Sequence, residues 1–249
     1  MSQLVRLEVS EGVATVTLDS PHNRNALSAA LVGRLNRALD GSAADDRALV
    51  VVLRSSGRVF CSGADMSEAA DVGMEQGSRT LIALLRQIVA HPKPVVCVLG
   101  GPVRAGGIGI VGACDVVIAV EDATFAFTEA RLGLAPAAIS LTTVRRMTDR
   151  ATSLLFLSGE TFDGAEAARI GLVTKAVPAD DLESEVGSVL ESLAKATTQG
   201  LSETKNLLNA RVLADIDEHG DDLASMSARL FGSDEAREAM RAFLEKRSK

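Results

Sequence analysis

The chain has 249 residues, of which 47% are hydrophobic and 24% charged, and it lacks Trp and Tyr. A chain of this length and composition can bury a core without disulfides or a metal. The net charge of −7, with no concentrated basic face, argues against a nucleic-acid-binding protein. No apolar run approaches the ~18 residues of a membrane span.

Two alternating segments, residues 4–9 and 13–18, predict a β-hairpin at the start of the chain. Ser28 then precedes an amphipathic pattern, which predicts an N-capped helix. The apolar run at residues 48–54 predicts a buried strand.

The rest of the chain alternates strand and helix patterns as far as Pro178 and is nearly all helical beyond it. Strands are predicted at residues 94–99, 115–120 and 172–176, and helices at residues 75–90, 140–157 and 163–170. This alternation predicts an α/β core followed by a helical appendage.

The three cysteines, Cys61, Cys97 and Cys114, are far apart in the sequence and form no C-x-x-C pair. This usage favours reduced, packed thiols in a cytoplasmic protein. The three histidines are isolated from one another, so no zinc site is predicted.

A glycine run at residues 107–112 matches G-x-G-x-x-G, and Glu129 follows at about the ~20-residue distance of the dinucleotide fingerprint. That fingerprint needs its first glycine directly after a strand. Here several residues separate the predicted strand 94–99 from Gly107, so the sequence does not favour a nucleotide-binding dehydrogenase.

A better explanation of the glycines is that they let backbone N–H groups face a pocket. The stretch 105–107 lies at a strand-to-helix junction, where free N–H groups and a partial positive charge can stabilise an oxyanion. The stretch 57–66, with Gly63 and Ala64 after a buried strand, has the same character. The competing explanation is close packing of a helix against the sheet, which Gly109 and Gly112 are expected to serve.

Four ordered motifs follow one another along the chain: SPHNRNALS, GRVFCSGADM, KPVVCVLGGPVRAGGIGIVGACD and LSGETFDGAEAARIGLV. Together they resemble the enoyl-CoA hydratase/isomerase (crotonase) superfamily, and the resemblance extends over essentially all 249 residues. The resemblance implies an α/β fold, with a spiral of ββα units over residues 1–195 that carries an acyl-CoA site. A C-terminal helical region at residues 196–249 would make trimers, often paired into hexamers.

The resemblance also implies the site. The backbone N–H groups of Ala64 and Gly106 would form an oxyanion hole for a thioester oxygen, and the segment 62–66 would hold the adenine end of coenzyme A. The implied substrate-binding residues are Arg24, Ser62, Ala64, Asp65, Met66 and Gly106, with Arg24 as a phosphate partner. No metal and no separate cofactor is implied, because coenzyme A is part of the substrate.

The chain departs from the pattern of the family's hydratases, which use two glutamates around the attacking water. The first position aligns with Gly109 and the second with Glu129, so Glu129 is the expected proton-transfer residue. A carboxylate in an apolar pocket has a raised pKa, which suits a general acid or base near neutral pH. The alternative is a structural glutamate at a helix N-terminus that stabilises the helix dipole, with Arg131 or Arg104 as candidate partners.

The leading hypothesis is hydration of a 2-enoyl-CoA with Glu129 as acid and base. The water would be held by Glu129 itself or by a second carboxylate. The candidates for this second carboxylate are Asp65, Glu68 and Asp71, in the loop after the predicted strand 48–54. One carboxylate suffices for a 1,3-proton shift, so double-bond isomerisation is the rival. A non-catalytic acyl-CoA binder and an RNA-binding branch of the superfamily are further alternatives, and the charge argues against the last.

The sequence says less about the substrate's acyl group than about the reaction. The segment 129–140 resembles the branched or glutaconyl-type hydratase subgroup, and Arg104 is hypothesised to pair with a substrate carboxylate. The walls of the acyl pocket are expected from residues 67–90 and 135–141.

Overall fold

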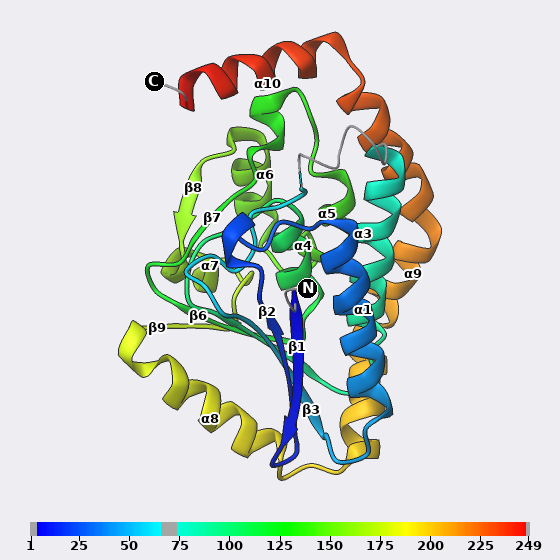
Figure 1. Ribbon diagram of the computed structural model, residues 1–249, viewed down its shortest axis with the longest axis vertical. Helices are drawn as coiled ribbons and strands as arrows, with labels where there is room; N and C mark the ends of the chain where they lie inside the picture. The colour runs from blue at the N-terminus through cyan, green and yellow to red at the C-terminus, as the bar shows by residue number, and fades with distance from the viewer. Residues whose placement is uncertain (1–3, 66–73, 248–249) are drawn as a thin grey trace.

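Two β-sheets with helices packed on them make up the computed structural model, which describes residues 4–65 and 74–247 (Figure 1). The larger sheet has the strand order β1-β2-β3-β4-β6-β9, and the smaller one β5-β7-β8. The strands are β1 (Val5–Ser10), β2 (Val13–Leu18), β3 (Val50–Ser55), β4 (Val95–Leu99), β5 (Val103–Arg104), β6 (Val116–Val120), β7 (Thr124–Ala126), β8 (Thr161–Asp163) and β9 (Lys175–Val177).

The helices follow the strands in the alternating order that the sequence predicts. The α-helices are α1 (Ala29–Ala44), α3 (Met74–Val89), α4 (Gly106–Ala113), α5 (Ala137–Thr143), α6 (Asp149–Ser158), α7 (Gly164–Arg169), α8 (Leu182–Leu193), α9 (Thr198–Phe231) and α10 (Asp234–Arg247). The described residues also contain the 3₁₀ helices η1 (Pro21–Asn23), η2 (Thr128–Leu132) and η3 (Ala179–Asp181), each between a strand and an α-helix.

The N-terminal hairpin is confirmed. Strands β1 and β2 pair antiparallel, with Val5 opposite Leu18 and Ser10 opposite Val13. The connecting residues Glu11 and Gly12 both have positive φ, at 51° and 81°. This backbone conformation matches the right-handed twist of the flanking strands and allows a two-residue turn.

The core of the larger sheet is formed by parallel strands with apolar side chains on both faces. The pairs β2–β3, β3–β4, β4–β6 and β6–β9 are parallel, and β4 is buried along its whole length. Parallel sheets are stable only when both faces are covered. The three cysteines belong to this core, since all are buried and unpaired.

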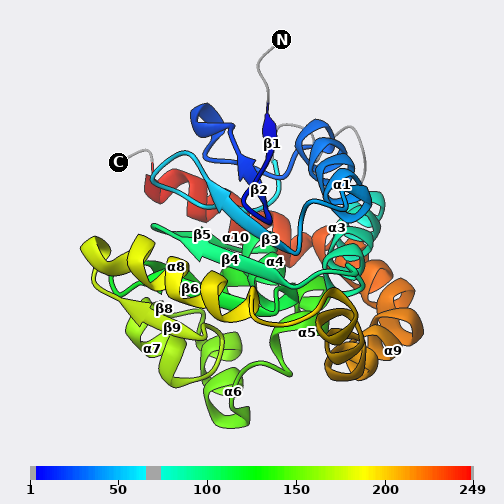
Figure 2. The same cartoon turned by 90° about the horizontal axis from the view of Figure 1, so that it is seen from below.

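The helices cover the sheet in separate groups. Helix α3 packs against α1 and α9, and the three lie side by side in Figure 1, whereas α8 packs against β6 and lies apart from them in Figure 2. The predicted N-cap of α1 is confirmed, because the Ser28 hydroxyl oxygen accepts a 3.2 Å hydrogen bond from the Leu31 N–H.

Several elements differ from the sequence prediction. The single helix expected at residues 140–157 is two helices, α5 and α6, because the chain leaves helical geometry before Thr148, the N-cap of α6. The strand expected at residues 172–176 is β9, somewhat later in the chain. The smaller sheet was not predicted, because strands of two or three residues are too short to show periodicity.

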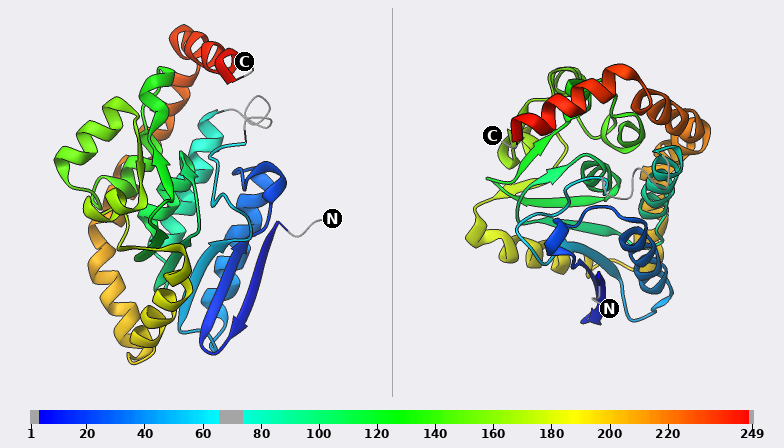
Figure 3. Two further views of the ribbon diagram at one scale, coloured as in Figure 1. Left: turned by 90° about the vertical axis from the view of Figure 1, so that its left-hand side faces the viewer. Right: turned by 45° about the horizontal axis from the view of Figure 1, so that its top comes forward.

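The C-terminal helices return to the core. The 34-residue helix α9 packs along α3 and α5, and α10 crosses one end of the molecule and contacts η2 (Figure 3). Among the described residues, no helix is long and apolar enough to cross a membrane.

Candidate active site

The two glycine-containing turns singled out in the sequence lie against each other. Cys61 and Val103 form an isolated parallel bridge, and the Arg104 N–H donates a 3.0 Å hydrogen bond to the Cys61 carbonyl. A Cβ built onto Gly63, whose φ is +97°, would lie only 2.9 Å from Cβ of Ala105. Glycine at position 63 therefore permits the close approach of the two turns.

Each turn offers one backbone N–H that is not used within the described chain. Gly106 is the first residue of α4, and the first N–H groups of a helix have no partner inside it. Neither the Gly106 N–H nor the Ala64 N–H donates a hydrogen bond to a residue within 4–65 or 74–247. Ala105, the N-cap of α4, has the unusual φ of +45° for a residue with a side chain.

Gly109 and Gly112 of α4 serve close packing, as the competing explanation expects. The surface they pack against is formed by neighbouring helices and not by the sheet. A Cβ on Gly109 would lie 2.8 Å from Cγ2 of Ile139 and 3.2 Å from Cδ1 of Leu85. A Cβ on Gly112 would lie 2.8 Å from the Thr142 carbonyl oxygen. Glycine at these positions lets α4 pack closely against α5.

Gly106 and Glu129 open into the same cavity, which has a volume of about 120 Å³. Its wall comes from α3, α4, η2, α5, the turn before α5, and the end of α9, and it is mostly apolar. The lining residues are Ser78, Leu81, Gly106, Glu129, Leu134, Ala135, Pro136, Ala137, Ala138, Ile139, Ser227, Leu230 and Phe231. Parts of both segments expected to wall the acyl pocket, 67–90 and 135–141, thus line the cavity that Glu129 and Gly106 share.

Glu129 lies in η2 with its carboxyl group turned inward. Its Oε2 atom is buried and has no hydrogen-bond partner in the described structure. Burial raises the pKa of Glu129 above its ordinary value of 4.5, although a hydrogen bond to its own backbone N–H partly opposes the shift. A carboxyl group in this state can take and return a proton near neutral pH.

Glu129 lies in the first turn of η2, as its structural alternative expects, but no pairing with Arg131 or Arg104 is present among the described residues. The Arg131 Nε donates to the Ser158 carbonyl at 2.6 Å. The Arg104 guanidinium donates to the Thr124 carbonyl at 2.5 Å and to the Thr124 hydroxyl at 3.0 Å. Arg104 also does not line the cavity, so the hypothesis that it pairs there with a substrate carboxylate is not supported by its position.

Four of the expected substrate-binding residues lie close together beside the first turn. The Ser62 N–H donates to the Arg24 carbonyl at 3.1 Å, and the Ser62 hydroxyl donates to the Asn23 carbonyl at 3.3 Å. The Asn23 side chain donates to the Asp65 carboxylate at 3.3 Å. Arg24 and Ala64 are exposed, whereas Asp65 is half-buried and does not line the cavity.

Three other residues named from the sequence lie outside the described residues. They are Met66, expected to bind coenzyme A, and Glu68 and Asp71, which were candidates for holding water.

Comparison with known proteins decides the family. The profile of the enoyl-CoA hydratase/isomerase family matches residues 8–249. The chain belongs to this family. A Rhodobacter capsulatus protein named as a probable enoyl-CoA hydratase is 34% identical over 98% of this chain and 95% of its own. The Escherichia coli 1,2-epoxyphenylacetyl-CoA isomerase is 30% identical over 100% of this chain and 98% of its own.

A solved structure agrees with these relatives. The enoyl-CoA hydratase from Mycobacterium avium is 44% identical, covers 99% of this chain and 98% of its own, and superposes with a TM-score of 0.92. The protein is therefore an enzyme of the enoyl-CoA hydratase/isomerase family with the crotonase fold, and that family acts on acyl-CoA thioesters.

Some residues of this family member's cavity were not predicted. Ser227, Leu230 and Phe231 come from the end of α9, more than 90 residues beyond Glu129 in the sequence. No local pattern marks them, because they reach the cavity only through the packing of α9. The sequence offers a weak indication for Ser78. It lies three residues before Leu81 and therefore on the same face of α3, which is largely apolar.

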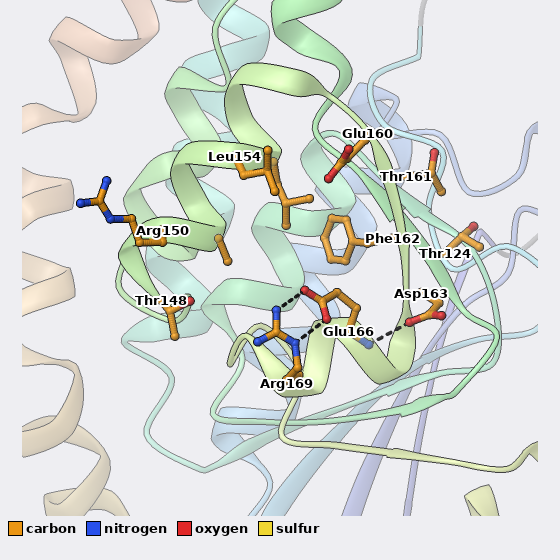
Figure 4. A pocket seen from close by; sticks show the side chains of 12 residues that line it. Thr124, Thr148, Arg150, Leu154, Glu160, Thr161, Phe162, Asp163, Glu166 and Arg169 are labelled. Atoms are coloured by element: carbon orange, nitrogen blue, oxygen red, sulfur yellow. Dashed lines mark hydrogen bonds and ion pairs between the residues drawn. The ribbon is translucent and has the colours of Figure 1, made fainter.

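A wider groove of about 700 Å³ lies between α6, β8 and α7 (Figure 4). Two of its charged side chains are engaged with each other, since Arg169 forms two 2.6 Å hydrogen bonds with Glu166. Asp163 caps α7 by accepting a 2.8 Å hydrogen bond from the Glu166 N–H. Neither Glu129 nor Gly106 lines this groove, so we assign the family chemistry to the smaller cavity.

Proposed function

We propose that this enzyme adds water across the double bond of a 2-enoyl-CoA, with Glu129 moving the proton. The observation that carries the proposal is that Glu129 and Gly106 share one small, mostly apolar cavity in which the buried Oε2 atom has no partner among the described residues. A free acid–base group and an N–H donor at one cavity are the two elements that enolate chemistry on a thioester needs.

In this proposal the thioester oxygen lies between the N–H groups of Ala64 and Gly106. Both N–H groups lack an acceptor among the described residues, and the turns that carry them are in contact. As negative charge moves onto the oxygen, two fixed donors stabilise it without reorganisation. Removal of one such donor typically costs about 3–4 kcal/mol of transition-state stabilisation.

The proton moves through Glu129. The ionised carboxylate accepts a proton from water while the water oxygen bonds to C3, and the electron pair of the double bond shifts toward the thioester. The protonated carboxyl group then returns the proton to C2, so that one water molecule is added in total. The raised pKa supports this role, because it makes Glu129 a stronger base than an ordinary glutamate.

The coenzyme A part of the substrate would lie across the turn at residues 62–66. Arg24 supports this placement, because the residue is exposed and its backbone carbonyl accepts a hydrogen bond from the Ser62 N–H. A homotrimer or a dimer of trimers, as the resemblance implies, stays a prediction.

Isomerisation of a 3-enoyl-CoA is the second candidate. It is favoured by the crowding at Gly109, where Ile139 and Leu85 occupy the space that a second carboxylate would need. A 1,3-proton shift needs Glu129 and the oxyanion hole but no bound water.

The test is to incubate the purified protein separately with a 2-enoyl-CoA and a 3-enoyl-CoA, beside its Glu129→Gln variant. We expect hydration of the first substrate, with kcat lowered about 10²–10⁴-fold in the variant. We also expect kcat/KM of the wild type to fall as the pH drops through the raised pKa of Glu129, because the carboxylate form is the base.

The control is Glu160→Gln, which changes an exposed carboxylate outside the cavity and should leave the rate unchanged. Conjugation of the 3-enoyl-CoA without hydration of the 2-enoyl-CoA would select the isomerase instead. Tight binding of both thioesters with no turnover would reject catalysis.

A further inference from the structure

Among the described residues, three polar side chains line the cavity: Glu129, Ser78 and Ser227. They come from η2, α3 and α9, and the rest of the described wall is formed by Gly106 and apolar side chains. These three groups are the described side chains that can hold a water molecule beside the substrate.

The hydroxyl group of Ser78 differs from those of neighbouring helical residues. Serine and threonine inside helices commonly donate to the carbonyl of the preceding turn. Ser227 does so to Leu223 at 3.0 Å, and Thr80, two residues after Ser78, does so to Gln76 at 2.8 Å. The Ser78 hydroxyl has no hydrogen-bond partner in the described residues, although only 9% of the residue is exposed.

The Ser78 side chain borders the same 120 Å³ space as the Glu129 carboxyl group, whose buried Oε2 atom lacks a partner among the described residues. Cavities of this size with polar groups in the wall can hold ordered water. A carboxyl group and a hydroxyl group from different elements therefore border one space that has room for water.

We propose that Ser78 holds the attacking water together with Glu129, taking the place of the carboxylate that Gly109 does not supply. This inference rests on the proposed hydration. The water donates one O–H to the Glu129 carboxylate and the other to the Ser78 oxygen, which leaves the lone pairs of its own oxygen free to bond to C3. The proton accepted by Glu129 passes to C2, and Ser78 is unchanged at the end of the cycle.

Among the described residues, the alternatives for a second polar group are weaker. A side chain at Gly109 would collide with Ile139 and Leu85. Asp65 interacts with Asn23 and does not line the cavity. The orientation of the Ser227 hydroxyl is fixed by its bond to the Leu223 carbonyl, whereas the Ser78 hydroxyl has no partner among the described residues and can rotate to accept from the water. Glu68 and Asp71 lie outside the described residues.

The experiment compares Ser78→Ala, Ser78→Thr and Thr80→Ala with the wild type on a short-chain 2-enoyl-CoA. We expect Ser78→Ala to lower kcat for hydration about 10²-fold, the loss typical of a misplaced reactant, with KM unchanged. Ser78→Thr restores a hydroxyl and should recover most of the lost rate. Thr80→Ala removes a hydroxyl from the same helix outside the cavity and should keep the wild-type kcat and KM.

The outcomes separate this inference from the proposed function. Hydration by Ser78→Ala at the wild-type rate, while Glu129→Gln is inactive, overturns the role of Ser78 and leaves the hydratase intact. A loss in Ser78→Ala that Ser78→Thr does not recover, with a lowered Tm, assigns Ser78 a structural role and also overturns it. If the wild type does not hydrate any 2-enoyl-CoA, the proposed function itself fails.

Discussion

Glu129 has a raised pKa, and the two arginines expected beside it donate to other residues. Arg104 and Arg131 are the two residues expected as partners of Glu129. Their guanidinium groups donate to Thr124 and Ser158 instead. A nearby cation would lower the pKa of Glu129 and make it a weaker base. Because these cations are engaged elsewhere, burial dominates and the pKa rises.

Gly109 is the residue that most clearly separates this site from a two-carboxylate site. A Cβ there would approach Ile139 Cγ2 to 2.8 Å, closer than van der Waals contact allows. Overpacking of this kind usually costs about 1–3 kcal/mol. The position is therefore closed to any side chain unless the wall of the cavity moves.

A double-mutant cycle tests this crowding. We expect Gly109→Ala to lower the free energy of unfolding by about 1–3 kcal/mol and Ile139→Ala to lower it by about 2–5 kcal/mol. The double variant should lose less than the sum, because removal of Cγ2 makes room for the new methyl group. Chemical denaturation measures all three values.

Gly77→Ala is the matched control, because a Cβ at this glycine of α3 meets nothing within 4 Å and should not destabilise. Additivity of the two changes within about 0.5 kcal/mol would contradict the proposed crowding.

At the scale of elements, the end of α9 completes the cavity. Leu230 and Phe231 line it, and the chain then turns into α10, which packs on η2. A Cβ on Gly133, the residue that ends η2 with φ +69°, would lie 3.2 Å from the backbone of Ala236. The C-terminal helices therefore support the segment that carries Glu129.

The contribution of α9 predicts a change in acyl-chain selectivity. Leu230→Ala enlarges the cavity, so we expect the kcat/KM ratio of longer to shorter 2-enoyl-CoA thioesters to rise about tenfold, the lower end of what one methylene is worth in a pocket. The measurement is kcat/KM over a series of straight-chain thioesters.

Leu208→Ala is its control, because Leu208 lies on the same helix with 72% of its surface exposed. An unchanged chain-length profile in Leu230→Ala would show that α9 does not bound the acyl group.

Across the whole molecule, a buried polar cluster fixes α9 to the start of the parallel strands. Lys205 forms a 2.8 Å ion pair with Asp115 and donates to the Ile88 carbonyl at 3.0 Å. Asn209 donates to the same carboxylate at 2.9 Å. Burial lowers the pKa of Lys205, while Asp115 opposes that shift. This attachment holds one end of α9 while the other end lines the cavity.

His91 belongs to the same buried region and makes the stability of the fold depend on pH. Burial lowers its pKa below the ordinary 6.5, and its ring contacts Ser42 and the backbone of Lys93. The unfolded chain binds a proton at about pH 6.5 while the folded chain does not, so stability falls as the pH drops from there toward the lowered pKa.

We expect the His91→Gln variant to lose part of this dependence. Its unfolding free energy, compared with that of the wild type between about pH 8 and pH 5, should decline less on acidification. Glu129 acts in the opposite direction, because its raised pKa makes acidification stabilising, but it contributes equally to both proteins. Parallel pH curves would contradict a role for His91.

The sequence by itself determined the local elements and the family. The β1–β2 hairpin, the Ser28 cap of α1 and the buried strands β3, β4 and β6 were predicted because each depends on periodicity or turn chemistry within a few residues. The ordered motifs likewise identified Glu129 and the two glycine turns, since those depend on residue type and order alone.

Only the tertiary structure decided what surrounds Glu129. The filling of the space beside Gly109 by Ile139, the unpaired hydroxyl of Ser78 and the wall from the end of α9 involve residues distant in the chain. The physical reason is that packing contacts carry no local sequence signal. A side chain meets its neighbours only after helices and sheets have docked, and that docking determines which polar groups are left without partners.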